Sequence, residues 1–116
     1  MITCMVRYEI DPEQLDAFES YARAWIKLIE KYGGVHHGYF VPATDPPNTR
    51  FSFSDLGREG AKNIAIALFS FSDNETYESY RHAVTADPEC AAATLDQRKT
   101  RCFTSYERTF LTPIER

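Results

Sequence analysis

The chain has 116 residues, of which 43% are hydrophobic, 14% aromatic and 26% charged, a composition typical of one globular domain. Two independent domains would each be too short to build a core without metals or disulfides, so we expect residues 1–116 to form a single domain. No segment approaches the roughly 20 apolar residues that cross a bilayer. The first nine residues also lack the pattern of a secretory signal, and we expect neither a membrane segment nor a secreted protein.

Charge argues against nucleic acid as a partner. Lysine and arginine total 13 against 17 acidic residues, giving a net charge of -4, whereas nucleic-acid binding usually depends on a clustered basic face. The densest basic run, Arg98 to Arg101, is typical of a solvated helix end.

The cysteines indicate a reducing environment. Cys4, Cys90 and Cys102 are scattered and show no Cys-x-x-Cys spacing, so neither a zinc site nor a disulfide framework is expected. Free thiols are typical of the cytoplasm, where we expect this protein to reside.

The first third of the chain predicts a strand, a helix and a second strand. Residues 2–10 alternate between two faces with a period of two, as in a half-buried strand. Residues 11–14 predict a helix start, with an aspartate cap, a proline at the first position and a glutamine that completes a capping box. An apolar stripe then continues to Tyr32, and two glycines end the helix. Residues 35–41 form the next predicted strand.

Residues 43–63 are the least regular part of the sequence, with several proline and glycine breakers. Within them, residues 50–54 (RFSFS) alternate, which predicts either a short strand or a flap over a pocket. Residues 63–71 are apolar on both faces, as in a central strand.

Two helices and a strand are predicted for the remainder. A capping box at residues 72–75 opens a helix that turns Tyr77, Tyr80 and Val84 inward. Asp87-Pro88 begins a shorter helix that ends near Lys99, and residues 102–111 alternate as a last strand.

This element order, βαββαβ, predicts a ferredoxin-like α+β fold. Both helical connections can cover only one face of the sheet, while the strand at residues 63–71 is apolar on both faces. A second copy of the chain is the simplest cover for the other face, so we expect a homodimer.

The pair His36-His37 is the most suggestive polar feature. Adjacent residues of a regular strand point to opposite faces, so His37 would share a face with Tyr39, and His36 with Gly38. The two rings cannot hold one metal together, and no metal is expected. One of them can line a pocket as a catalytic acid, base or donor; the alternatives are a hydrogen-bonded core histidine and a surface residue. Gly38 allows a close approach of a helix or ligand, or marks a β-bulge.

Aromatic side chains are abundant on the helix faces that should meet the sheet, Trp25 and Tyr77 among them. Such a set forms either an ordinary core or a pocket for a flat organic molecule. The sequence contains no nucleophile elbow, phosphate-binding loop or dinucleotide fingerprint, which excludes the common hydrolase, kinase and dehydrogenase classes.

Three segments carry a family resemblance: FESYARAWIKLIEKYGGVHHGYFVP, IAIALFSFSDNETYESYR with the following ADPE, and SYERTFLTPI. Together they resemble the NIPSNAP family over nearly the whole chain. NIPSNAP domains are similar to the dimeric α+β barrels, in which two ferredoxin-like sheets meet face to face. That superfamily includes cofactor-independent monooxygenases of the antibiotic-biosynthesis type, haem-degrading enzymes and proteins with no known activity. Residues 44–62 depart from the family pattern, being longer and richer in proline and phenylalanine.

The resemblance implies a ligand site between the sheet and the helices of one subunit. Its implied lining comprises one of His36 and His37, together with the aromatic residues Tyr8, Trp25, Tyr39 and Tyr77. The first hypothesis is therefore a binder of a small planar or hydrophobic molecule, or a cofactor-independent monooxygenase in which a histidine or tyrosine takes a proton. The second is a non-catalytic dimeric scaffold. No cofactor is expected in either case.

Overall fold

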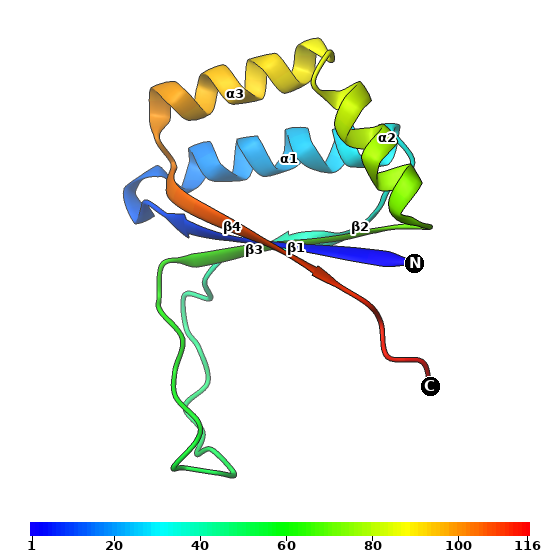
Figure 1. Ribbon diagram of the computed structural model, residues 1–116. Helices are drawn as coiled ribbons and strands as arrows, with labels where there is room; N and C mark the ends of the chain where they lie inside the picture. Colours follow the sequence, from blue (N-terminus) through cyan, green and yellow to red (C-terminus); the bar gives the residue numbers. More distant parts are fainter.

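The computed structural model describes residues 1–116 and contains the four strands and three α-helices that the sequence predicts. In chain order they are β1 (Ile2–Ile10), a short 3-10 helix (Pro12–Gln14), α1 (Leu15–Lys31), β2 (Val35–Phe40), β3 (Ile64–Phe71), α2 (Asn74–Val84), α3 (Pro88–Thr100) and β4 (Phe103–Leu111). The strands form one antiparallel sheet in the order β2-β3-β1-β4. All three helices lie on the same face of this sheet (Figure 1). The ferredoxin-like α+β prediction is confirmed.

The start of the first helix follows its sequence signals closely. The Asp11 carboxylate accepts a hydrogen bond from the backbone N–H of Glu13 at 3.0 Å, which satisfies one of the free donors of a helix N-terminus. The first turn is a 3-10 turn, so α1 begins at Leu15. At the other end Gly34 is required, since a Cβ there would lie 2.6 Å from the Ile29 side chain.

A bulge interrupts β2 at the two histidines. His36 pairs with Phe69 and Gly38 with Leu68, so His37 is an extra residue in the ladder. Gly38 has a φ of +129°, which suits glycine and allows the bulge. The extra residue shifts the alternation, so His36 and Tyr39 lie on the helix-facing side. The prediction that His37 and Tyr39 share a face is wrong for this reason.

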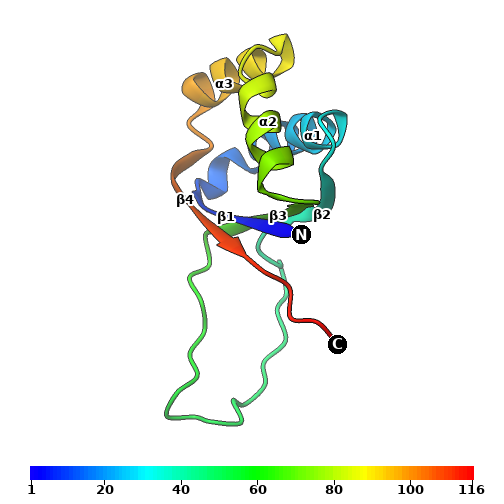
Figure 2. The same cartoon turned by 45° about the vertical axis from the view of Figure 1, so that its right-hand side comes forward.

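Residues 41–63 contain no helix or strand and form an arm that projects from the sheet. The arm extends away from the face that carries the helices (Figure 2). The strand considered for residues 50–54 is not formed. Instead, the Phe53 carbonyl accepts hydrogen bonds from the backbone N–H groups of Leu56 and Gly57 at 3.0 and 2.8 Å, and the Phe51 ring packs against Gly57.

The core lies between the sheet and the helices. Alternate residues of β1 and β3 face it, including Ala65 and Ala67, which are fully buried. From α2, the predicted inward residues Tyr77, Tyr80 and Val84 are all buried. No helix of the structure has the length and apolar character needed to cross a bilayer.

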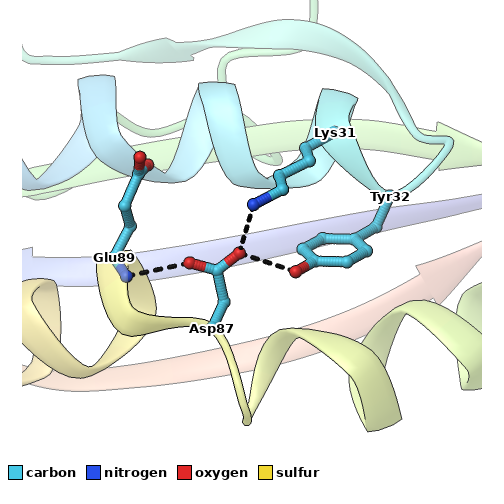
Figure 3. A network of polar contacts seen from close by, with 4 residues as sticks. All are labelled: Lys31, Tyr32, Asp87 and Glu89. Atoms are coloured by element: carbon cyan, nitrogen blue, oxygen red, sulfur yellow. Dashed lines mark hydrogen bonds and ion pairs between the residues drawn. The ribbon is translucent and has the colours of Figure 1, made fainter.

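Asp87, between α2 and α3, ties this pair of helices to the end of α1 (Figure 3). It is 4% exposed. Its carboxylate accepts hydrogen bonds from Lys31 Nζ at 2.8 Å, Tyr32 OH at 2.6 Å and the backbone N–H of Glu89 at 2.8 Å. The hydrogen bond from Lys31, followed by those from Tyr32 and Glu89, lowers the pKa of Asp87 to about 2.

We expect Asp87→Asn to lower the thermal midpoint by several degrees at pH 7, because the helix cap and the contact with the Lys31 ammonium are both weakened. The folded pKa of Asp87 lies below its ordinary value of 3.8. Its contribution to stability is therefore complete above about pH 4 and is lost as the pH falls towards 2.

Thermal melts of the Asp87→Asn variant between pH 2 and 7, followed by circular dichroism, measure both effects. Asp55→Asn, at an exposed aspartate of the arm, is the control and should leave the midpoint unchanged. A wild-type midpoint for Asp87→Asn at pH 7 would refute the structural role.

Candidate functional site

A cavity of about 820 Å³ lies between the helix-facing side of the sheet and the helices. This volume is within the range of small-molecule sites. Of its 22 lining residues, 16 are hydrophobic, so the cavity is suited to an organic molecule rather than to a hydrated ion. No group of three or more His, Cys, Asp or Glu side chains is placed to hold a metal.

The sheet forms one wall of this cavity, with Tyr8 of β1 at its centre. The Tyr8 ring lies 4.9 Å from that of Phe103 and 6.1 Å from those of Tyr39 and Tyr106. The hydroxyl groups of Tyr8 and Tyr39 are 3.3 Å apart. Tyr8 is therefore the centre of an aromatic cluster within this wall.

The helices form the opposite wall. Tyr21 and Trp25 of α1 and Tyr77 and Tyr80 of α2 contribute aromatic rings, and α3 contributes smaller side chains such as Ala91. Four of the sequence-predicted site residues thus line one cavity: Tyr8, Trp25, Tyr39 and Tyr77. The Trp25 indole N–H is buried and has no hydrogen-bond partner.

The buried phenols of the cavity are neutral hydrogen-bonding groups. Burial raises the pKa of Tyr8, Tyr21 and Tyr39 well above the ordinary value of 10. Burial likewise raises the pKa of the Cys4 thiol to about 11. The 22 lining residues include no Asp, Glu or His, so the cavity wall itself offers no side chain that accepts a proton at neutral pH.

His36 lies behind the cavity wall, not in it. Its ring stacks on Tyr39 at 5.2 Å and on Phe69 at 5.9 Å, both of which line the cavity. His36 Nδ1 accepts a hydrogen bond from the Gly38 backbone N–H at 2.8 Å, while Nε2 is buried without a partner. Burial, with a smaller effect from the neighbouring His37, lowers the pKa of His36 to about 4. His36 is therefore neutral at physiological pH.

His37 lies on the opposite side of the sheet. Its Nε2 atom is 2.7 Å from Ser70 Oγ, which is 2.8 Å from Thr3 Oγ1. Thr3 and Ser70 face each other across β1 and β3 on the helix-free face. Neither histidine is among the residues that line the cavity.

Sequence reasoning missed the arginines of the cavity. Arg81, Arg98 and Arg108 all line it. The signal lay in the register: Arg108 pairs with Val6 and shares the face of Tyr106, whose partner Tyr8 points toward the helices.

The fold defines a class of proteins of known structure. A NIPSNAP family protein of unknown function from Agrobacterium tumefaciens superposes with a TM-score of 0.72 at 16% identity, covering 98% of this chain and 94% of that one. An uncharacterised NIPSNAP domain protein from Burkholderia xenovorans gives 0.70 at 19% identity, covering 98% and 95%. A Nitrosomonas europaea protein, provisionally assigned as an antibiotic biosynthesis monooxygenase, gives 0.65 at 8% identity, covering 99% and 100%. These likenesses establish the fold.

The family follows from the sequence itself. The NIPSNAP family model matches residues 4–116, and the chain therefore belongs to the NIPSNAP family, as its sequence segments indicate. No curated protein sequence matches this chain.

A pH titration tests the environment of His36. Because its folded pKa lies below the ordinary value of 6.5, the folded state favours the neutral ring. The free energy of unfolding should therefore fall as the pH is lowered from about 6.5 to about 4. We expect the imidazole resonances of His36, assigned by their loss in His36→Gln, to titrate near pH 4 in NMR spectra. A midpoint near 6.5 would show that the ring is solvated.

Proposed function

We propose that this NIPSNAP protein binds a small planar, largely hydrophobic molecule in the cavity between the sheet and the helices. The observation that carries the proposal is the cavity itself: about 820 Å³, lined mainly by apolar and aromatic side chains. Aromatic rings present flat apolar surfaces that stack on planar ligands, and the tyrosine hydroxyl groups supply hydrogen bonds that orient them.

Cofactor-independent monooxygenation is the candidate reaction for such a ligand. Its support comes from the fold neighbours of the antibiotic biosynthesis monooxygenase type, and fold alone does not determine activity. The chemistry requires a group that takes a proton from the bound substrate. The lining residues supply none at neutral pH, and His36, which stacks on the wall residue Tyr39, does not itself line the cavity. Binding is therefore the part of the proposal that the cavity supports most directly.

A bulky residue at the cavity wall tests the binding proposal. Ala91 is exposed on α3 and lines the cavity, so Ala91→Trp should fill the space without disturbing the core. We expect it to weaken binding of the neutral fluorescent probe N-phenyl-1-naphthylamine by about tenfold or more, the loss that accompanies exclusion of an apolar body.

Ala83→Trp is the matched control, since Ala83 is also exposed but lies on α2 outside the cavity lining. This variant should bind the probe as the wild type does. The non-catalytic scaffold alternative predicts no probe binding to the wild type, and no thermal shift with any ligand, and either result would remove the binding proposal.

We further propose that the protein is a homodimer assembled through the helix-free face of the sheet. The most apolar part of this face lies on β2 and β3, where Phe40 is 54% exposed, and Leu111 of β4, which is 40% exposed, adds to it. Arg7 of β1 and Glu107 of β4 form an ion pair on the same face. Ile66 and Leu68 of the central strand β3 are half-buried at the middle of this face. Helices cover only the other face, and a second copy of the sheet offers a surface of the same shape and chemistry.

The arm supports the same assembly. It leaves the sheet on the helix-free side (Figure 1), so a second copy seated there would lie beside it. Phe53 and Leu56 near its tip are 69% and 78% exposed. These side chains have no cover within their own chain, and the neighbouring subunit would supply it.

A charge placed on the helix-free face should separate the subunits. We expect wild-type protein to sediment as a dimer in analytical ultracentrifugation, and Leu68→Glu as a folded monomer, because a buried unpaired carboxylate is strongly unfavourable. Leu95→Glu introduces the same charge at a leucine on the helix side that is 53% exposed, and should remain a dimer.

Replacing residues 44–60 of the arm by a short Gly-Ser linker should weaken the dimer without abolishing it. A monomeric wild type would refute the assembly.

A further inference from the structure

The cavity carries positive charge that nothing in the chain neutralises. Arg81, Arg98 and Arg108 line it, and no aspartate or glutamate does. The three salt bridges of the structure involve Arg7, Arg23 and Lys31, so none of the cavity arginines is paired with a carboxylate. This accumulation is notable in a chain whose net charge is -4.

Two of these arginines are held in place by aromatic side chains. Arg108 Nη1 donates a hydrogen bond to Tyr77 OH at 3.2 Å, and its guanidinium lies over the Phe110 ring at 4.9 Å. The Arg81 guanidinium lies over the Tyr80 ring at 5.9 Å. Such contacts orient a guanidinium while leaving its charge and most of its five N–H donors available.

Both groups act on the same end of the cavity, because the rings that they contact, Tyr77 and Tyr80, lie 5.8 Å apart. Burial raises the pKa of Cys4 and of Tyr77, and the positive charges of Arg108 and Arg81 partly oppose that rise at both residues. Cys4, on β1, and Tyr77, on α2, are themselves lining residues. One end of a mainly apolar cavity therefore has two cations next to it.

We propose that the ligand of this cavity is an amphipathic organic anion: a planar apolar body held among the tyrosine rings, with an acidic oxyanion group bound by Arg81 and Arg108. Guanidinium groups match carboxylates and related oxyanions through paired hydrogen bonds. Both arginines are exposed to solvent, so dissolved salt should screen this attraction. This assignment rests on the proposed function of the cavity and adds the charge of its ligand.

A pair of probes with the same aromatic skeleton separates charge from shape. The first is 8-anilinonaphthalene-1-sulfonate, an aromatic anion, and the second is the neutral N-phenyl-1-naphthylamine. We expect the Arg81→Gln/Arg108→Gln double variant to bind the anion about tenfold or more weakly than the wild type, the scale of a lost charged hydrogen bond. Its affinity for the neutral probe should be unchanged. Added salt should weaken only the anion's binding to the wild type.

Arg50→Gln removes the same charge from the arm, on the other side of the sheet, and should bind both probes normally. Arg81→Gln alone, at an exposed residue of α2, tests the same point with a smaller loss if the double variant fails to fold.

Equal losses for the two probes, or no loss for either, would overturn the assignment of charge while leaving the cavity as a binding site. Failure of both probes to bind the wild type, or equal binding to the Ala91→Trp variant, would instead overturn the proposed function itself.

Discussion

Both helical connections cross the same face of the sheet, and the properties of the molecule depend on this asymmetry. Strands β1 and β2 run parallel on either side of β3, and β3 and β4 run parallel on either side of β1. Parallel strands need crossover connections, which have one preferred hand. Consequently one face of the sheet receives every helix, and the other retains half of each strand's side chains without cover. The cavity lies on the first face, and the proposed assembly surface is the second.

The cavity lies where the helices do not all pack directly on the sheet. Helix α3 packs against α1 rather than directly on the strands. Asp87 fixes this arrangement, since its carboxylate caps α3 while accepting hydrogen bonds from Lys31 and Tyr32 at the end of α1. The Asp87 contacts thus stabilise the helix junction and also hold α3, which forms one side of the cavity, at its distance from the sheet.

The order of elements was predictable because its signals are local: the period of two in β1, the Asp11 cap and the Asp87-Pro88 start of α3. The side of the sheet on which His36 and Tyr39 lie was not predictable. The same residues fit a bulge or a regular strand, and only the register against β3 decides between them. The position of Arg108 beside the cavity was not predictable for a related reason. A charged residue in an edge strand is usually expected to face solvent. Only the pairing of Arg108 with Val6 shows that it lies on the helix-facing side.

The fold does not itself require the charge of the cavity. The three structures described above share this fold at 8 to 19% identity, so packing fixes the backbone but leaves most side chains free to vary. Arg81 and Arg108 are exposed residues outside the buried core. Two guanidinium groups without carboxylate partners repel each other and oppose folding slightly. Their presence beside a mainly apolar cavity is therefore better explained by the proposed anionic ligand than by a requirement of the fold.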